Sequence, residues 1–408
     1  MGVKRTLLFM LLISVGLASA QDIKVKSLKV FTNTDKNSIP VLNATRDYLY
    51  IDFDVQAEFL PNFHIIFKFC DKSWNPTENI FLLNQGQNIS YSLDFFTLPA
   101  TVQEAKYHYT NRFPDKNGDV SFPFSGKWKF FIVDSQDPTM IFGEGKFFVV
   151  NIDQPIKVNI KKETLDDKIY YPPQLGYVNW IITEADLIQD FFPFNVDEVE
   201  IIQNHLLDNS VVVSRNSNDN YRAFEWDGNS ELKFTAKDVR PGNEYRQVDL
   251  RDIDIYGSKN VRAQFDGIDY SRFFIQGRKD LNGSFELLSP KDPNATYLNV
   301  KFQVKPPDEV YGDIYLVGAF NNWELLADYK MVNNGNTFET TIELKRGIYD
   351  YQYVVVNGDL NDPADQDWFA LEGNNWTTTN EYNVFLWYKD QQYGGYDRII
   401  GYSKIQTR

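Results

Sequence analysis

Short runs of alternating polar and apolar residues, separated by turn-forming residues, constrain the fold of this chain more than any other feature. Residues 48–55 (YLYIDFDV) alternate with period two. Residues 126–134 (GKWKFFIVD) place Trp128, Phe130 and Ile132, at every second position, on one face. Residues 63–69 alternate more loosely, residues 142–150 form a further strand-like run after another turn, and clusters of Asn, Asp, Gly and Pro divide the runs. Such runs are typical of antiparallel β-sandwiches, so we expect an all-β chain. Only one short helix is expected, over Thr183–Gln189, behind an N-cap threonine.

Two turn-rich segments divide the chain into three units of similar length. They are Asn151–Pro155 and Ser289–Pro293, and each follows a predicted strand. We therefore expect three tandem Ig-like or early-set sandwiches, with an N-terminal unit over 21–152, a middle unit over 153–288 and a C-terminal unit over 289–408. Each is close to the usual domain size of about 100–150 residues. Aromatic residues make up 16% of the chain, which suits large sheet cores and argues against a disordered chain.

The first twenty residues predict a secretory signal peptide. Lys4 and Arg5 precede an apolar run that ends at about Leu17, and Ala18-Ser19-Ala20 forms a cleavage site before Gln21. The run is too short for a comfortable membrane span, although a retained N-terminal anchor is the alternative. No later segment is long enough to cross a bilayer as a helix. We therefore expect an exported chain without direct membrane insertion.

Acidic residues outnumber basic residues in this chain. Loss of Lys4 and Arg5 with the signal peptide takes the formal net charge from −15 to −17. Such a charge disfavours nucleic acid and anionic lipid as partners, because both are themselves negatively charged.

No motif for catalysis, cofactor binding or metal binding stands out. The sequence contains no nucleophile elbow, P-loop or dinucleotide fingerprint. Cys70 is the single cysteine, so neither an intrachain disulfide nor a cysteine-based zinc site is expected. The three histidines, far apart in the sequence, are His64, His108 and His205. Asp115–Asp119 resembles half of a calcium loop and Asp359–Asp367 gathers four aspartates, but a polar hairpin turn and an exposed acidic loop are the better explanations. We expect no enzyme, no cofactor and no metal.

The C-terminal unit contains a motif that is typical of sugar-binding modules. Residues 317–323 read VGAFNNW, and a second strand with alternating tyrosines follows at 346–359. This pattern resembles the glycogen-binding modules attached to starch and glycogen enzymes. In that resemblance Trp323 stacks on a sugar ring, and Gln352 replaces a lysine that binds hydroxyl groups. Asp359 and Leu360 stand where a second aromatic residue is frequent, so glycan binding is the alternative function and not the leading one.

Four further stretches extend a resemblance over nearly the whole mature chain. They are FCDKSWNP at 69–76, RPGNEYRQVDLR at 240–251, ALEGN at 370–374 and YDRIIGY at 396–402. In this order they resemble the type IX secretion system plug protein family of the Bacteroidetes, formerly a domain of unknown function. The resemblance runs from about Ile23 to Tyr402. Phe69 departs from the family, which usually has histidine before the cysteine.

The resemblance implies an interaction protein. Members of that family are periplasmic, and they bind the periplasmic mouth of the very large outer-membrane barrel that exports folded proteins. They close this pore when no substrate is passing. The resemblance therefore implies a periplasmic location, on the inner side of the outer membrane, and a translocon β-barrel as partner. Asn322, Trp323 and the charged strand Arg246–Asp254 are candidate contacts, although each has a structural explanation as well.

Overall fold

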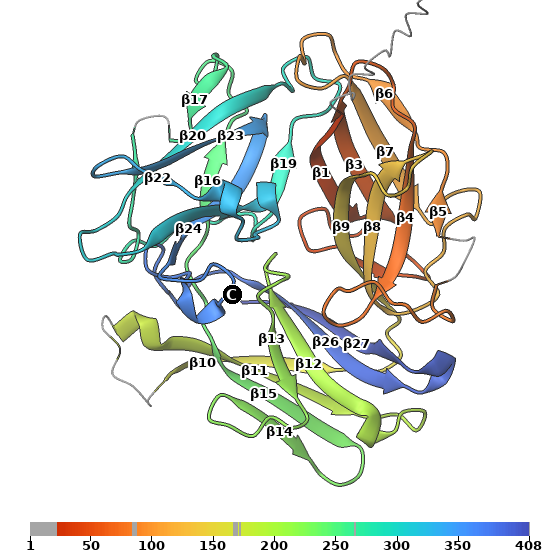
Figure 1. Cartoon of the computed structure of the whole chain (residues 1–408). Coiled ribbons are helices and arrows are strands. Elements are labelled where there is room, and N and C mark those ends of the chain that lie inside the picture. The colour runs from red at the N-terminus through yellow and green to blue at the C-terminus, as the bar shows by residue number, and fades with distance from the viewer. Residues whose placement is uncertain (1–22, 84–87, 166–169, 171–172, 265–266, 408) are drawn as a thin grey trace, which may run out of the picture.

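The computed structural model describes residues 23–83, 88–165, 170, 173–264 and 267–407. Within these ranges the strands form six sheets, and the helices are 3-10 turns of three or four residues. The sheets pack in pairs into three sandwiches, with sandwich 2 below sandwiches 1 and 3 in Figure 1. The expected all-β fold is confirmed. The predicted signal peptide, residues 1–20, lies outside the described residues, and no helix of the described part is long and apolar enough to cross a membrane.

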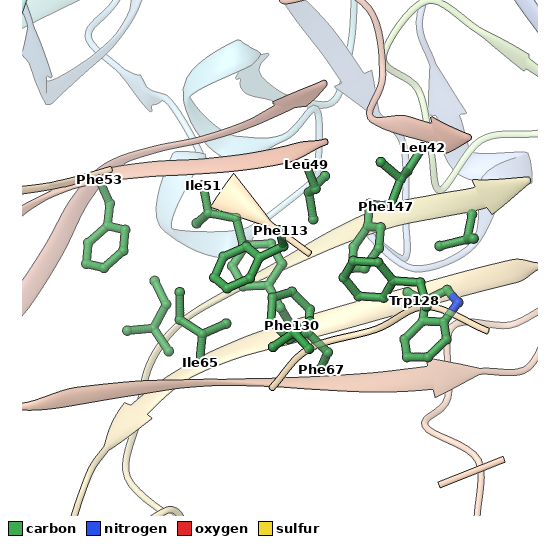
Figure 2. Close-up of a cluster of buried hydrophobic side chains, with 14 of the residues drawn as sticks. Leu42, Leu49, Ile51, Phe53, Ile65, Phe67, Phe113, Trp128, Phe130 and Phe147 are labelled. Carbon is green, nitrogen blue, oxygen red and sulfur yellow. The ribbon is translucent and has the colours of Figure 1, made fainter. Parts of the chain in front are cut away.

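Sandwich 1 comprises residues 24–150. One sheet contains, in spatial order, β1 (Lys24–Thr32), β3 (Leu49–Gln56), β7 (Tyr107–Phe113) and β6 (Phe95–Thr97). The other contains β2 (Val41–Asn43), β9 (Ile141–Val150), β8 (Gly126–Asp134), β4 (Phe63–Cys70) and β5 (Ile89–Ser90). Period-two alternation places Phe53, Phe67 and Trp128 in the core between the sheets (Figure 2). The rings of Phe67 and Phe113 meet edge to face at 4.8 Å, a favoured arrangement of aromatic pairs.

Sandwich 2 combines residues 157–239 with the last two strands of the chain. One sheet contains β10 (Lys157–Thr164), β11 (Tyr177–Asp186), β15 (Glu231–Val239) and β14 (Arg222–Trp226). The other contains β13 (Val211–Ser214), β12 (Val196–Gln203), β26 (Glu381–Asp390) and β27 (Tyr396–Gln406). Its core joins Ile181 and Phe234 of the first sheet to Val199 and Leu386 of the second. The 3-10 turns η1 (Pro173–Gly176), η2 (Pro193–Asn195) and η6 (Gln392–Gly394) lie in its loops.

Sandwich 3 comprises residues 246–367 and is inserted between strands of sandwich 2. In one sheet β24 (Gly347–Val356) pairs with β16 (Arg246–Asp249), β19 (Phe285–Leu287), β21 (Asp313–Gly318) and β25 (Gln366–Asp367). The other sheet contains β17 (Asn260–Arg262), β18 (Asp269–Tyr270), β20 (Tyr297–Lys305), β23 (Phe338–Lys345) and β22 (Val332–Asn333). Its 3-10 turns are η3 (Ala319–Asn321), η4 (Ala327–Tyr329) and η5 (Pro363–Asp365). Phe302 and Tyr351 meet in its core.

The sheets cross the boundary that was expected between residues 288 and 289. The strands β16 to β19 precede it and belong to sandwich 3, whereas β26 and β27 follow it and complete sandwich 2. The units 153–288 and 289–408 are therefore not the units that the sheets form. The reason is long-range pairing: β26 lies beside β12 and buries Val384 and Leu386 in the core of sandwich 2. Turn residues mark where the chain reverses, but they do not select the sheet that the next strand joins.

The helix expected over Thr183–Gln189 is wrong. Its first four residues belong to β11, in which Thr183 and Ala185 lie opposite Phe234 and Leu232 of β15. Both Thr183 and Ala185 are buried. Pairing with strands on both sides outweighs a short helical signal, because intrinsic helix propensity is weak beside tertiary contacts.

Candidate functional site

A buried carboxylate joins sandwich 1 to sandwich 3. Oδ2 of Asp54, on β3, lies 2.6 Å from Nζ of Lys345 on β23, and both side chains are 1% exposed. The Tyr297 hydroxyl donates to the same oxygen at 2.8 Å, and Nδ1 of His108 lies 2.7 Å from Oδ1. Burial raises the pKa of Asp54, but the hydrogen bond from His108 and the charge of Lys345 outweigh burial, so the pKa lies below its usual value. The carboxylate is therefore ionised at neutral pH and fully paired.

A second buried ion pair joins sandwich 1 to sandwich 2. Nζ of Lys127, on β8, lies 2.8 Å from Oε1 of Glu200 on β12. The indole of Trp387 donates to the other oxygen of Glu200 at 3.1 Å. Beside this pair the rings of Phe148 and Phe385 stack with their centroids 4.4 Å apart. An apolar core shared by the two sandwiches thus surrounds a paired charge, which holds them in one arrangement.

The VGAFNNW turn joins sandwich 2 to sandwich 3. Asn321 fixes the turn, because its Oδ1 accepts from the backbone N–H of Gly318 at 2.9 Å. Asn322 and Trp323 then adopt left-handed backbone angles, with φ of 54° and 62°. The indole N–H of Trp323 donates to the carbonyl of Gly283 at 2.7 Å, and its ring packs on Tyr245 at 4.2 Å. The Tyr245 hydroxyl in turn accepts from Nδ2 of Asn204, just after β12, at 3.3 Å, so this turn is part of the contact between sandwiches 2 and 3.

The two candidate sugar-binding residues face different spaces. Trp323 is 4% exposed and lines a cavity of about 150 Å³ at which all three sandwiches meet. Gln352 is 7% exposed and lines another cavity, of about 410 Å³, between sandwiches 2 and 3. In the sheet Gln352 lies opposite Val317, at the start of the motif. The structure thus places Gln352 beside the strand that leads into the turn of Trp323, but it does not bring the two residues to one binding surface.

The other candidate contact, Arg246–Asp254, is buried at its start and exposed at its end. Arg246 is buried, and its guanidinium lies 2.9 Å from Oε1 of Glu372 and 3.1 Å from Oδ1 of Asp269. Arg251, further along, is exposed and paired with Asp249 at 2.7 Å. Arg246 therefore stabilises sandwich 3 and its attachment, whereas Gln247, Asp249 and the residues from Arg251 to Asp254 are exposed.

The four stretches that carry the family resemblance gather at these junctions. Trp74 and Ile399, from the first and last stretches, lie in the core shared by sandwiches 1 and 2. Tyr245, from the second, packs on the VGAFNNW turn. Asn374, from the third, donates to the backbone carbonyl of Gln174 at 2.7 Å, which ties it to sandwich 2. Residues of the four stretches that carry the family resemblance thus fix the relative placement of the sandwiches.

Three carboxylates that the sequence did not single out are buried together between sandwiches 2 and 3. They are Glu244, Asp280 and Asp350. Backbone N–H groups donate to all three; among them, that of Thr379 lies 2.6 Å from Glu244 and that of Gly283 lies 2.9 Å from Asp350. Burial and the charge of Asp350 raise the pKa of Asp280 to about 8, and burial raises that of Asp350 to about 6. Glu244 and Asp350 lie in the stretches 240–251 and 346–359, but nothing within either stretch predicts that the three carboxylates meet.

An exposed apolar cluster lies where a loop of sandwich 1 meets the β26–β27 loop of sandwich 2. Ile80, Phe81 and Tyr393 are 69%, 61% and 50% exposed. Nδ2 of Asn79 donates to the carbonyl of Tyr393 at 2.8 Å, which connects the two loops. Tyr393 has a left-handed φ of 52°, and its ring packs against Phe124 at 5.3 Å. We call Ile80, Phe81 and Tyr393 the loop cluster.

The remaining sequence candidates have local structural roles. Cys70 is buried, and burial raises the pKa of its thiol to about 11. Oδ1 of Asp115 accepts from the backbone of Val120 at 2.9 Å, as in a hairpin turn. Oδ2 of Asp365 accepts from the backbone of Asp359 at 2.7 Å within its own loop. Across the described residues, no group of three or more His, Cys, Asp or Glu is placed to hold a metal ion.

Comparison with known proteins identifies a shared fold. No family model matches the chain, and no curated protein matches it. The crystal structure of a hypothetical protein from Parabacteroides merdae ATCC 43184, at 2.30 Å resolution, is similar with a TM-score of 0.77 and 22% sequence identity. The match covers 95% of this chain and 99% of that chain. A structure described for the host cell surface retention of a 1.5-MDa bacterial ice-binding adhesin gives a TM-score of 0.13 and carries no argument. The likeness to the Parabacteroides protein therefore establishes the fold over nearly all of both chains.

Proposed function

We propose that this protein is a periplasmic plug of a type IX secretion system. It binds the periplasmic end of the large outer-membrane translocon barrel and closes it when no substrate is passing. The observation that carries this proposal is the location of the four stretches that resemble the plug family. Their residues Trp74, Tyr245, Asn374 and Ile399 lie where the sandwiches join. The family resemblance thus concerns the assembly of the whole body and not one sugar-binding module.

The joined sandwiches suit the physical task of a plug. A large barrel encloses an aqueous channel, so a protein that closes it must keep its shape across a wide opening. Here the paired charges Asp54–Lys345 and Lys127–Glu200 are buried between sandwiches, where the loss of one partner is strongly destabilising. A body that is already ordered also loses little conformational entropy on docking, so contact area is converted into affinity efficiently.

The loop cluster is the proposed anchor on the translocon. Large exposed apolar side chains that gather at one place mark interaction sites, whereas single ones are common on any surface. Ile80, Phe81 and Tyr393 come from two sandwiches and are held together by Asn79. Aromatic side chains of this kind are frequent hot spots, and they need a surrounding contact of more than about 1,000 Å² to form a stable complex.

Glycan binding through Trp323 and Gln352 has less support. The indole is buried against Tyr245 and donates its N–H to Gly283, and Gln352 lines a separate cavity. A sugar ring that stacked on Trp323 would have to displace the contact between sandwiches 2 and 3.

Co-purification from outer membranes tests the proposal. The protein is tagged at its C-terminus in the native cell, the outer membrane is extracted in mild detergent, and mass spectrometry identifies the proteins recovered with it. A stoichiometric β-barrel partner of very large mass is the expected result. Recovery of the protein alone, together with retention on an amylose column that Trp323→Ala abolishes, would overturn the proposal in favour of glycan binding.

A further inference from the structure

A cavity between sandwiches 2 and 3 has the size of a small-molecule site. Its volume is about 410 Å³, and Gln203, Arg240, Gln352, Trp368 and Phe369 contribute to its wall. Ligand pockets in proteins commonly occupy about 300–1,000 Å³ and combine aromatic walls with a few polar groups. This cavity has both kinds of wall, and it lies apart from the loop cluster that we propose as the translocon anchor.

One arginine in this wall has no acidic partner among the residues that the structure describes. The guanidinium of Arg240 lies over the ring of Phe369 at 5.1 Å and over the ring of Tyr170 at 5.8 Å. Among the described residues it makes no ion pair, and its side chain makes no hydrogen bond. Two aromatic contacts therefore hold the guanidinium in place while its N–H donors are left for another molecule.

The acidic groups of the same wall are already engaged. Asp238 forms an ion pair with Arg222. Glu372 is bound by Arg246 and by Arg272, whose nearest nitrogens lie 2.9 Å and 3.2 Å from its oxygens. Arg240 is thus the charged group of the wall that no carboxylate neutralises within the described structure. The cavity favours an anion, even though the chain as a whole is acidic.

A buried carboxamide in the same wall also lacks a hydrogen-bond partner within the described part of the chain. Gln352 is 7% exposed, and none of the described residues hydrogen-bonds to its side chain. A carboxamide offers two N–H donors and one acceptor oxygen, so Gln352 can bond a polar group of a ligand from the wall of the cavity.

We propose that this cavity binds a small organic anion whose carboxylate is received by Arg240. The guanidinium can donate two parallel N–H bonds to a carboxylate, an arrangement that lysine cannot reproduce. The Gln352 amide bonds a second polar group of the ligand, and Trp368 and Phe369 contact its ring or apolar part. Two sources provide this chemistry: a short peptide with a free carboxylate, and an acidic sugar.

Calorimetric titration of the full-length mature protein tests the inference with four probes. N-acetylphenylalanine and digalacturonate carry carboxylates, whereas N-acetylphenylalanine amide and maltose are their uncharged counterparts. At least one carboxylate is expected to bind, and its uncharged counterpart is expected to bind at least about tenfold more weakly, because it lacks the charge-assisted pair. The carboxylate probe that binds with the higher affinity shows whether the ligand is a short peptide or an acidic sugar. The inference fails if neither carboxylate binds at millimolar concentration, or if charged and uncharged probes bind equally.

Matched variants locate the binding. Arg240→Gln is expected to lower the affinity for the carboxylate probe about tenfold. Arg240→Lys keeps the charge and should recover only part of that affinity. Gln352→Leu should also weaken binding. The control is Arg251→Gln, which removes an exposed arginine outside this wall and should change nothing. Equal affinity of the wild type and Arg240→Gln would overturn the inference. This site goes beyond the plug function, and co-purification with the translocon can succeed or fail independently of it.

Discussion

Lys345 and Asp54 form a buried ion pair between two different sandwiches, with their charged atoms 2.6 Å apart. Lys345 ends β23 of sandwich 3, and Asp54 lies near the end of β3 of sandwich 1. An ion pair taken out of water is costly unless its geometry and its hydrogen bonds are complete. Here Tyr297 and His108 provide the further hydrogen bonds of the Asp54 carboxylate. The pair therefore specifies how the two sandwiches fit together.

Removal of Lys345 should destabilise the protein strongly. Lys345→Met leaves the Asp54 carboxylate buried without its main counter-charge, and the expected loss is about 3–5 kcal/mol in the free energy of unfolding, measured by urea denaturation. Asp54→Leu combined with Lys345→Met removes both charges and should recover much of this loss. The control Lys330→Met breaks an exposed pair with Asp313 and should have little effect. A loss no larger than in the control would contradict this role of the pair.

Trp323 should behave as a structural residue and not as a sugar platform. Trp323→Ala removes a buried ring between sandwiches and should cost about 3–5 kcal/mol of stability. Trp323→Phe keeps a ring but leaves the Gly283 carbonyl without its donor, at a cost of about 1–3 kcal/mol. Thermal and urea unfolding measure both losses. If Trp323→Ala left stability unchanged and abolished binding to amylose, the assignment would be wrong.

The carboxylates between sandwiches 2 and 3 should make stability depend on pH. Asp280 and Asp350 have pKa values raised to about 8 and about 6, so the folded protein holds protons that the unfolded chain releases above about pH 4. The stability that Asp280 and Asp350 contribute to the fold is therefore fully present below about pH 4. It is lost as the pH rises through about 6 and then about 8. The unfolding temperature should fall over this range. Asp280→Asn should flatten the fall, and an equally steep fall in that variant would argue against Asp280 as its source.

The loop cluster should matter for binding and not for folding. The double variant Ile80→Ser and Phe81→Ser removes exposed side chains, so its unfolding temperature should stay close to that of the wild type. If Phe81 is a hot spot, affinity for the translocon should fall at least about tenfold, which corresponds to about 1.4 kcal/mol. Quantitative co-purification measures this change. Tyr311→Ser, at an exposed position on sandwich 3, serves as the control. Equal recovery of the partner by all three proteins would show that the anchor lies elsewhere.

The sequence predicts the strands of this fold better than their partners. Period-two alternation over 48–55 and 126–134 corresponds to β3 and β8, because half-buried strands need apolar residues on one face. The return of β26 to sandwich 2 has no local signal. It depends on a space beside β12 that exists only after that sheet has formed. The expected boundary at residue 288 was therefore misplaced.

The candidate site shows the same limit. The VGAFNNW motif predicts a turn with an aromatic residue, and the structure contains that turn. Whether Trp323 is open to a ligand depends on a surface from another part of the chain, and Tyr245 covers it. Gly283, with a left-handed φ of 90°, leaves room for the indole because a β-carbon there would lie 3.2 Å from its nitrogen. Such three-way contacts cannot be deduced from residue spacing within one segment.

Outer-membrane permeability is the most direct test of the proposed plug. Uptake of a large fluorescent dextran is compared between native cells and cells that lack this protein but retain the translocon barrel. The plug function predicts increased uptake in the deletion strain, restored to the native level by the wild-type protein and less completely by the Ile80→Ser and Phe81→Ser double variant. Unchanged uptake in the deletion strain, with the barrel present and unoccupied by substrate, would contradict the proposal that this protein closes the pore.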